Sequence, residues 1–321
     1  MKLLVVILNY RTPQLTIDCL YSLAAEGGLP EGARVVVTDG ASGDDSVSRI
    51  QAAIDEHGWQ AWATLQPLDH NGGFAYGNNA AIQPALASDD PPEYVLLLNS
   101  DTQVRTAAVQ TLVDFLEQHP DAAMVGSRLE DPDGTSQFST FRFPSLWSEL
   151  DEALRIGPVH RLLKRFVTLI PTPETACQVD WVAGASLLIR REVFETIGLL
   201  DDGYFLYYEE ADFCLRAARA GFSCWYEPRS RVMHLIGQST GVTVRGQALP
   251  RRPKYWFDAR RRYFLKNHGK LFTTVLDAVW SLAYPVGRLQ LYLRRKPVFD
   301  PRRLWYDYLA NSVFRRGFGI S

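Results

Sequence analysis

Residues 94–101 read Tyr-Val-Leu-Leu-Leu-Asn-Ser-Asp, an unbroken apolar run that ends in an amide and a carboxylate. A strand that is apolar on both faces is typical of a parallel sheet covered by helices on both sides. Ligands of such sheets bind outside the carboxyl ends of the strands, where Asp101 would lie. A carboxylate there is suited to hold a hard divalent cation against a pyrophosphate. The stretch therefore predicts an open α/β fold with a metal-assisted nucleotide site at one edge of its sheet.

Strand and helix patterns alternate from residue 3 to about residue 127. The periodicity predicts strands over 3–9, 34–39, 61–66, 94–99 and 122–127, and helices over 13–25, 44–57, 75–87 and 106–118. Such alternation indicates a mostly parallel sheet with helices on both faces. Residues 128–178 break the rhythm, and we expect an irregular or partly helical excursion near the site.

Regular structure is expected again from residue 179. The pattern predicts a strand over 179–190, helices over 191–197 and 209–220, and short strands near 223–227 and 231–236. Beyond Pro250 the chain becomes helical, and over 271–293 it is largely apolar with a polar stripe that includes Asp277 and Arg288. Because these charges and Pro285 interrupt the apolar run, we expect this segment to lie in a membrane interface or to pack on the body.

Charge is distributed unevenly along the 321 residues. The formal net charge is −2, but residues 241–321 hold 17 Lys and Arg against 4 Asp, a balance of +13 that leaves −15 on the first 240. An acidic body argues against a nucleic-acid enzyme, and a basic tail favours contact with anionic lipid. We predict a body over 1–240, with one half over 1–127 and another over 128–240, and a basic helical C-terminal region over 241–321.

The cysteines and the amino terminus indicate a cytosolic protein. The four cysteines form no C-x-x-C pair and no secreted framework, so we expect reduced thiols and no zinc site. The apolar start is short and lacks a small-residue cleavage site, which favours a first β-strand over a signal peptide.

Polar groups follow several of the predicted strands. Asp39 can accept hydrogen bonds from a nucleobase or ribose, or it can cap the following turn. Residues 71–79, Asn-Gly-Gly-Phe-Ala-Tyr-Gly-Asn-Asn, predict a loop whose amides approach a phosphate, or a plain glycine turn. Asp101 is interpreted as a metal ligand rather than a helix cap, because it precedes the next helix by several residues.

Residues 207–216 bring three carboxylates to a predicted helix start. Glu209, Glu210 and Asp212 would be stabilised there by the helix dipole. As an alternative, Glu210 lies among aromatic residues that can raise its pKa and make it a general base. Asp212 can pair with Arg216 one turn later.

A histidine follows on a short predicted strand. His234 alternates with apolar neighbours, which is the usual pattern of a structural residue. Its neutral imidazole can instead complete a metal shell.

Taken in order, these motifs resemble the family 2 glycosyltransferases of the GT-A fold, in particular their bacterial rhamnosyltransferase-like branch. The resemblance covers residues 3 to about 270. The matching segments are V-V-I-L-N-Y-R at 5–11, Asp39, N-x-G-F-A-x-G-N-N at 71–79, N-x-D at 99–101, G-A-x-x-x-x-R-R at 184–191, an aromatic-E-D-x-D-x-C-x-R-like run at 208–216, and His234. Two positions depart from the branch: Gly40 stands where it usually has Asn, and Glu210 where it usually has Asp.

The resemblance implies an inverting transfer of a sugar, with rhamnose favoured, from a nucleoside diphosphate to a hydroxyl of a bacterial cell-surface glycan or lipid-linked acceptor. Residues 1–240 would form the catalytic domain, with a donor half 1–127 and an acceptor half 128–240. Glu210 would be the catalytic base, and Asp101 and His234 would hold Mg²⁺ or Mn²⁺. Donor-binding residues would be Asn9, Arg11, Asp39, Asn71, Gly72, Gly73, Phe74, Asn78, Asn79, Asn99 and Ser100. Acceptor-side or supporting residues would be Trp181, Gly184, Ala185, Glu209 and Asp212.

The expected partners are a nucleotide-sugar donor, dTDP-rhamnose or a UDP-sugar, and the acceptor, with no nucleic acid. The expected location is the cytoplasm. For the C-terminal helices, the cytoplasmic face of the inner membrane and a second copy of the chain are both left open. Two rival functions also stay open: a sugar-phosphate nucleotidyltransferase, whose G-x-G-[ST]-R-L loop is missing near the amino terminus, and a nucleotide-sugar-binding protein without catalysis.

Overall fold

The computed structural model describes residues 1–25, 29–235 and 250–320, and within them the chain forms two compact units. The first comprises Met1–Phe141, Ile170–Phe205 and the chain from Glu209 to the end of the described stretch at 235. The second comprises Arg142–Leu169, Leu206–Tyr208 and the described residues from 250 onward. The predicted domain boundary at residue 240 and the end of the strand predicted over 231–236 lie outside the described residues.

The first unit contains the sheet and the helices that cover it. Its strands are β1 (Leu3–Asn9), β2 (Arg34–Asp39), β3 (Ala63–Pro67), β4 (Tyr94–Asn99), β5 (Thr102–Val104), β6 (Ala122–Glu130), β7 (Thr140–Phe141), β8 (Cys177–Val179), β9 (Trp181–Val182), β10 (Ser186–Arg190) and β11 (Ser223–His234). Its helices are α1 (Pro13–Ala24), α2 (Ser46–Glu56), η1 (Trp59–Ala61), α3 (Gly73–Leu86), α4 (Ala108–Gln118), α7 (Arg191–Ile197) and α8 (Glu209–Arg219). The predicted alternation up to residue 127 is confirmed, with small shifts at the ends of the elements.

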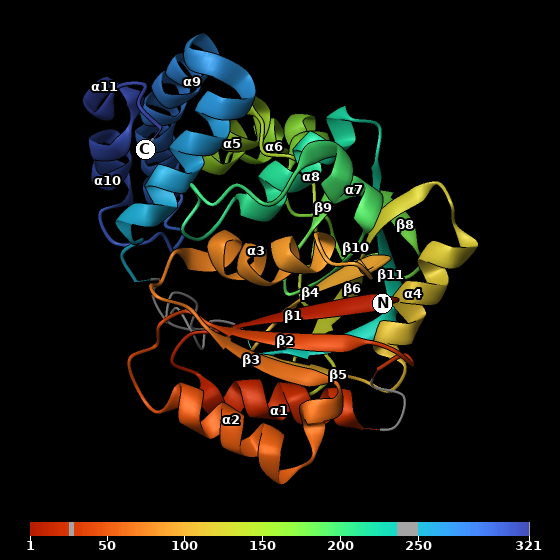
Figure 1. The fold of residues 1–321 in the computed structure, drawn as a ribbon. Helices are drawn as coiled ribbons and strands as arrows, with labels where there is room; N and C mark the ends of the chain where they lie inside the picture. The colour runs from red at the N-terminus through yellow and green to blue at the C-terminus, as the bar shows by residue number, and fades with distance from the viewer. Residues whose placement is uncertain (26–28, 236–249, 321) are drawn as a thin grey trace. The chain divides into compact units, whose positions relative to one another are not determined.

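Nine of the described strands form one sheet in the order β3-β2-β1-β4-β10-β6-β11-β5, with β8 paired to β11. Strands β1 to β4 are parallel, as predicted. Beyond β4 the sheet is mixed, because β10 runs antiparallel between β4 and β6, and β5 and β8 run antiparallel to β11. Figure 1 shows α1 and α2 on one face of the parallel half and α3 on the other.

Three local predictions differ from the structure. The strand predicted over 179–190 is divided into β9 and β10, and the two strands predicted over 223–236 form the single strand β11. The pairing of β11 with β6 shifts register between Glu227 and Arg231, which explains the apparent gap in the pattern. The predicted glycine loop over 71–79 is mostly helical, because α3 begins at Gly73. Strand β5 was not predicted, because its three residues are too few to show a period of two.

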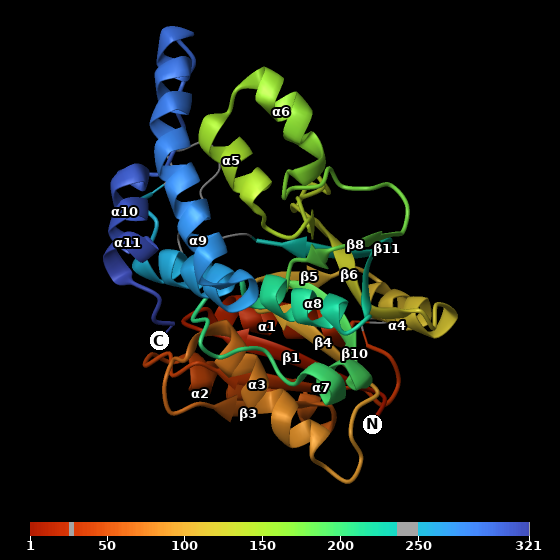
Figure 2. The same cartoon turned by 90° about the horizontal axis from the view of Figure 1, so that it is seen from above.

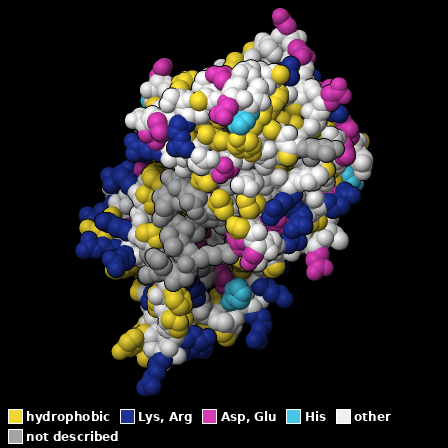
Figure 3. Space-filling model, turned by 90° about the horizontal axis from the view of Figure 1, so that it is seen from below, with side chains coloured by type: hydrophobic (Ala, Val, Ile, Leu, Met, Phe, Trp, Pro, Cys, Tyr) yellow, Lys and Arg dark blue, Asp and Glu magenta, His cyan; other side chains and the backbone are white. Residues whose placement is uncertain are grey.

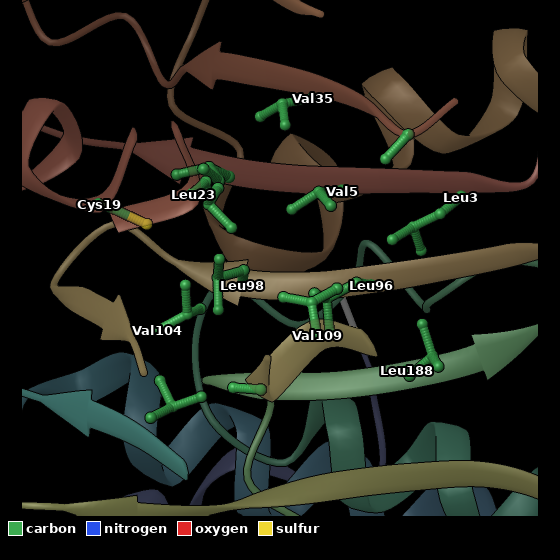
Figure 4. Close-up of a cluster of buried hydrophobic side chains, with 14 of the residues drawn as sticks. Leu3, Val5, Cys19, Leu23, Val35, Leu96, Leu98, Val104, Val109 and Leu188 are labelled. Atoms are coloured by element: carbon green, nitrogen blue, oxygen red, sulfur yellow. The ribbon is translucent and has the colours of Figure 1, made fainter. Parts of the chain in front are cut away.

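Alternate residues of β1 and β4 build the main core. Leu3, Val5 and Ile7 project from β1 toward the helices, and Leu96 and Leu98 do so from β4. In Figure 4, Val5 and Leu98 lie near Leu23 of α1, and Leu96 lies beside Val109 of α4. The period of two therefore places one face of the sheet against α1, α2 and α4.

Glycines allow α3 to pack closely on the opposite face. A Cβ atom at Gly77 would lie 2.6 Å from Cδ1 of Leu8 on β1. At Gly73, whose φ is +87°, it would lie 1.9 Å from the carbonyl oxygen of Phe205. That carbonyl accepts a hydrogen bond from the backbone N–H of Phe74, at 2.9 Å. The start of α3 is thus fixed against residue 205, as only glycine permits at position 73.

The second unit is helical. It contains α5 (Leu146–Leu154), α6 (Gly157–Leu163), η2 (Lys164–Phe166), α9 (Lys254–Leu293), α10 (Leu304–Asn311) and α11 (Val313–Arg316). Gly269 has a non-helical φ of 84°, so α9 consists of two helices joined at a kink. Figure 2 shows α9 running past α10, α11 and α5. A Cβ atom at Gly287 would lie 2.4 Å from the carbonyl oxygen of Leu154, so the second half of α9 packs directly on the backbone of α5.

Charged residues that interrupt the apolar run of α9 turn inward in the second unit. Asp277 is buried and accepts hydrogen bonds from Arg260 at 2.9 Å and from the hydroxyl of Tyr308 at 3.1 Å. Arg288 and the hydroxyl of Tyr284 both donate to Asp300. The polar stripe predicted on this helix therefore makes its contacts in the interior of the second unit.

None of the helices within the described residues is both long and apolar enough to cross a membrane. The four cysteines are free thiols, as predicted, and Cys19, Cys214 and Cys224 are buried. The pKa of the Cys214 thiol is raised well above its usual value, because it is hydrogen-bonded to Cys224 and buried.

Candidate functional site

Asp39 lies in a buried hydrogen-bond network at the carboxyl ends of β1 and β2. Asn9 is its register partner across the two strands, and the Asn9 amide donates to Oδ2 of Asp39 at 2.7 Å. Ser42 binds both carboxylate oxygens, with its hydroxyl 2.7 Å from Oδ2 and its backbone N–H 3.0 Å from Oδ1. Arg11 donates from its backbone to the Ser42 hydroxyl and from its side chain to the Ser42 carbonyl. The first strand thus orients the predicted base-binding carboxylate.

Thr12 connects this network to the end of β4. Its hydroxyl lies 3.3 Å from Oδ1 of Asn9 and 3.4 Å from the hydroxyl of Ser100. Leu8 of β1 is the register partner of Asn99 in β4. The predicted donor-binding residues of β1, β2 and β4 therefore meet at one edge of the parallel half of the sheet, as the ends of its strands require.

Asp101 and His234 approach each other across β5 and β11. The antiparallel pairing of the two strands sets His234 opposite Thr102, directly after Asp101 in the chain. Oδ1 of Asp101 lies 3.4 Å from Nε2 of His234, and both side chains are largely buried. Among the described residues no cluster of three or more His, Cys, Asp and Glu side chains surrounds this pair. The chain therefore offers a carboxylate and an imidazole at this point.

Gln137 holds the histidine from its other side. Its amide oxygen lies 3.3 Å from Nδ1 of His234, and its amide nitrogen donates to the His234 carbonyl oxygen at 2.7 Å. A metal-binding imidazole commonly has its second nitrogen fixed in this way. The same amide nitrogen of Gln137 also donates to Oδ1 of Asp131 at 2.8 Å, and this second bond fixes the position of the glutamine. The pair thus fits a divalent cation, whose remaining ligands would come from a diphosphate and water.

Glu210 lies beside the start of β10. Its Oε1 accepts a hydrogen bond from the backbone N–H of Gly184 at 3.1 Å. A Cβ atom at Gly184 would lie 2.8 Å from Cγ of Glu210 and 3.2 Å from Cζ of Phe74. The carbonyl of Ala185 accepts from the backbone N–H of Asn99, at 3.1 Å. Residues 184 and 185 therefore link Glu210, the predicted base, to the end of β4.

The surroundings of Glu210 favour its action as a general base. Burial raises the pKa of its carboxyl above the usual 4.5, although the hydrogen bond from Gly184 acts in the opposite direction. A carboxylate with a raised pKa takes up a proton more readily than an ordinary one.

Several predicted donor-binding residues make contacts within the fold. Oδ1 of Asn71 accepts from the backbone N–H of Gly73 at 3.0 Å. The Asn78 amide donates to the carbonyl of Phe74 within α3, and the Asn79 amide donates to the carbonyl of Leu200. These bonds hold the start of α3 in place. Gly72 and Gly73 supply the turn into it.

The predicted acceptor-side and supporting residues also make contacts within the fold. The half-buried Trp181 ring stacks on Phe141, with centroids 4.2 Å apart and planes 17° apart. Asp212 is buried and pairs with Arg216 at 2.9 Å, as predicted. Arg216 also donates to the carbonyls of residues 197 and 199, so this pair fixes α8 to the preceding turn. Glu209 is buried at the start of the same helix.

Sequence reasoning did not single out Thr12, Ser42 or Gln137. Ser42 belongs to the loop after Asp39, so a hydroxyl three residues beyond the carboxylate was an available signal. No sequence signal pointed to Gln137, because it is 97 residues from His234 and lies in the irregular segment.

The chain matches a known protein family over most of its length. Residues 2–248 match the family described as glycosyltransferase like family 2. The chain belongs to this family. The predicted resemblance is confirmed, and the match supports a glycosyltransferase enzyme.

Individual relatives of this glycosyltransferase extend the picture. It is 29% identical over 224 residues, 64% of its length and 68% of the relative's, to the N-acetylglucosaminyl-diphospho-decaprenol L-rhamnosyltransferase of Mycobacterium tuberculosis. It is 27% identical over 318 residues, 98% of its length and 90% of the relative's, to the low-salt glycan biosynthesis hexosyltransferase Agl10 of Haloferax volcanii.

A solved structure supports the GT-A fold of the chain. The mannosyltransferase PcManGT of Pyrobaculum calidifontis, in complex with GDP-Man and Mn²⁺, superimposes with a TM-score of 0.57 at 17% identity. The superposition covers 92% of this chain and 75% of the mannosyltransferase.

Gly184→Ala is expected to slow transfer by this glycosyltransferase without unfolding it. The added methyl group would displace Glu210, and a misplacement of about 1 Å can cost roughly 100-fold in rate. The measurement is nucleoside diphosphate release at saturating donor, with the melting temperature as a check on folding. Gly157→Ala serves as control, because a Cβ atom there meets nothing within 4 Å. An unchanged rate in Gly184→Ala would show that the position of Glu210 does not limit transfer.

Proposed function

We propose that this enzyme is an inverting, divalent-metal-dependent glycosyltransferase that moves a sugar, with rhamnose favoured, from a nucleoside diphosphate to a hydroxyl of a glycan or lipid-linked acceptor. Membership in the family supports the reaction class. The name of the mycobacterial relative supports rhamnose and a lipid-linked acceptor, and that of the haloarchaeal relative supports a hexose. dTDP-rhamnose is the favoured donor, and a UDP-sugar is the alternative.

Glu210 is the proposed base. The acceptor oxygen attacks the anomeric carbon, the bond from that carbon to the diphosphate oxygen breaks, and the hydroxyl proton passes to the carboxylate. The backbone N–H of Gly184 holds Oε1, so Oε2 receives the proton. Burial raises the pKa of Glu210 and so strengthens it as a base for this step.

Asp101 and His234 are the proposed protein ligands of Mg²⁺ or Mn²⁺. A divalent cation bound there supplies positive charge that stabilises the departing diphosphate. Gln137 fixes the tautomer of His234 that presents Nε2 to the site. In this proposal Asp39, oriented by Asn9 and Ser42, binds the base of the nucleotide, within a donor half over 1–127.

The acceptor is placed by the other half of the proposed catalytic domain. The Trp181 ring, stacked on Phe141, offers an apolar platform for a sugar face. Gly184 and Ala185 carry the chain from this platform to Glu210 and Asn99.

The observation that carries the metal-dependent part of the proposal is the approach of Asp101 Oδ1 to His234 Nε2 at 3.4 Å, with Nδ1 held by Gln137. The test is calorimetric titration with dTDP-rhamnose and a panel of UDP-sugars, in Mg²⁺ or Mn²⁺ and in chelator. We expect one nucleotide sugar to bind with metal and to bind far more weakly without it.

Asp101→Ala is expected to weaken metal-dependent donor binding by roughly 10–100-fold or more, since even partners of metal ligands have effects of about this size. Asp89→Ala is the matched control, because Asp89 is exposed. Equal donor binding in metal and chelator, and in both variants, would refute the metal site. Binding of UDP-sugars alone would replace the favoured donor and keep the mechanism.

A further inference from the structure

The second half of α9 carries an exposed stripe of apolar side chains. Its members are 43–80% exposed: Leu271, Val275, Leu282, Val286, Leu289 and Leu293. We call this set the α9 stripe. Spacings of three, four and seven residues place all of them on one side of the helix. No charged residue lies between them on that side, because Asp277 and Arg288 turn toward the interior of the unit.

The opposite side of the same helix is already used within the second unit. Leu276, Trp280, Ala283 and Leu291 are buried there. Trp280 stacks on Tyr308 of α10, with centroids 3.7 Å apart. A helix that is apolar on both sides is ordinarily covered on both. The α9 stripe therefore calls for an occupant outside the described contacts.

Basic side chains lie at both ends of the α9 stripe. Lys266 and Lys270 are exposed before it, and Arg294, Arg295 and Lys296 are exposed after it. On the face shown in Figure 3, hydrophobic side chains lie beside Lys and Arg side chains at the lower edge. An apolar strip with positive charge at its ends matches a membrane surface, where acyl chains lie beneath anionic head groups.

Aromatic side chains border the α9 stripe. The indole N–H of Trp305 donates to the carbonyl of Ser281 at 3.0 Å, which places this ring along the side of α9. Phe318 lies under the ammonium group of Lys270, at 5.6 Å. Both rings are exposed, as is Tyr292 near the end of the helix. Tryptophan and tyrosine are enriched where a protein meets the head-group layer of a bilayer.

A second copy of the chain fits the α9 stripe less well. The stripe runs about 33 Å along the helix and is about 10 Å wide, or roughly 330 Å². A stable dimer needs roughly 800 Å² from each partner. Because both ends of the stripe are basic, pairing two copies in either direction sets like charges together.

From these observations we infer that the α9 stripe is a docking surface for an anionic membrane, on which the helix lies in the plane of the head groups. This inference goes beyond sugar transfer and does not depend on which donor the enzyme uses. It assigns the basic C-terminal region the role of bringing the catalytic domain to a lipid surface.

The test is flotation of the full chain with vesicles of phosphatidylglycerol and phosphatidylcholine, and with vesicles of phosphatidylcholine alone. We expect flotation with the anionic vesicles only, and weaker flotation as salt is raised. Leu282→Ser with Leu289→Ser is expected to reduce binding by about tenfold or more, because two exposed leucines lose their burial in lipid. Leu162→Ser is the control, since Leu162 is 77% exposed, more than either of the two leucines, but lies on α6.

Donor titration and the melting temperature are measured on the same variants to check that they remain folded. A loss of vesicle binding can then be distinguished from a failure of the proposed function. Light scattering without lipid tests the second occupant. The inference is overturned if no vesicle binds, if the double variant floats as well as the parent chain, or if the chain forms a dimer that this variant dissociates.

Discussion

Glu210→Gln is expected to reduce sugar transfer by about 10²–10⁴-fold, the usual contribution of a general base, while donor binding persists. Glutamine keeps an oxygen for the backbone N–H of Gly184, so the contact that positions the side chain is retained. It has no carboxylate to take the acceptor proton. Nucleoside diphosphate release and calorimetric donor titration, measured on the same preparation, separate the two effects.

The pH dependence of the parent enzyme follows from the same group. Because burial raises the pKa of Glu210, transfer is expected to fall as the pH drops through that raised pKa, above the usual 4.5. The effect on stability has the opposite sense. The folded protein binds this proton more tightly than the unfolded chain, so the carboxyl costs no stability below its unfolded pKa and becomes destabilising as the pH rises through the folded pKa. Glu210→Gln is therefore expected to melt at a higher temperature than the parent near neutral pH, with no difference in strong acid.

Glu192→Gln is the matched control, because Glu192 is exposed on α7. It should leave the rate, the donor affinity and the melting temperature unchanged. The assignment of Glu210 as the base fails if transfer falls by less than about tenfold, or if donor binding is lost in proportion to the rate.

The sequence predicts the edge of the sheet at which the site lies, because strand ends are visible in it. Asn9, Asp39 and Asn99 each close an apolar run, and parallel strands bring such ends together. Glu210 could be proposed because it lies among aromatic residues at a helix start. The prediction located these groups without locating the partners that orient them.

Those partners come from contacts between distant parts of the chain. Gln137 reaches His234 across 97 residues, from a segment without a regular period. Arg260 reaches Glu149 across 111 residues, and neither residue belongs to a motif. Periodicity reports which side of an element is apolar, and it is silent on which polar groups meet in the interior. For the same reason the sequence left open whether the segment with Asp277 and Arg288 lies in a membrane interface or packs on the body, and it did not show that these two charges turn inward.

Arg260→Ala is expected to destabilise the second unit by about 3–5 kcal/mol, because it would leave buried carboxylates without their cation. Arg260 is 4% exposed, and its guanidinium donates to Glu149 at 2.6 Å and to Asp277 at 2.9 Å. Asp277 also accepts from the backbone N–H of Val313 at 2.8 Å, so the loss would spread from α5 and α9 to α11. The measurement is urea denaturation of the full chain. Arg302→Ala, which removes an exposed arginine, should change the free energy of unfolding by less than about 0.5 kcal/mol.

The same variant separates the roles of the two units. The site residues that bind the donor in our proposal all belong to the first unit, whereas the α9 stripe belongs to the second. If the second unit loosens in Arg260→Ala, vesicle binding should fall in parallel with stability while donor binding is retained. Simultaneous loss of donor and vesicle binding would show instead that the first unit depends on the second for its folding. A variant as stable as the parent chain would contradict the assignment of Arg260 as a residue that stabilises the second unit.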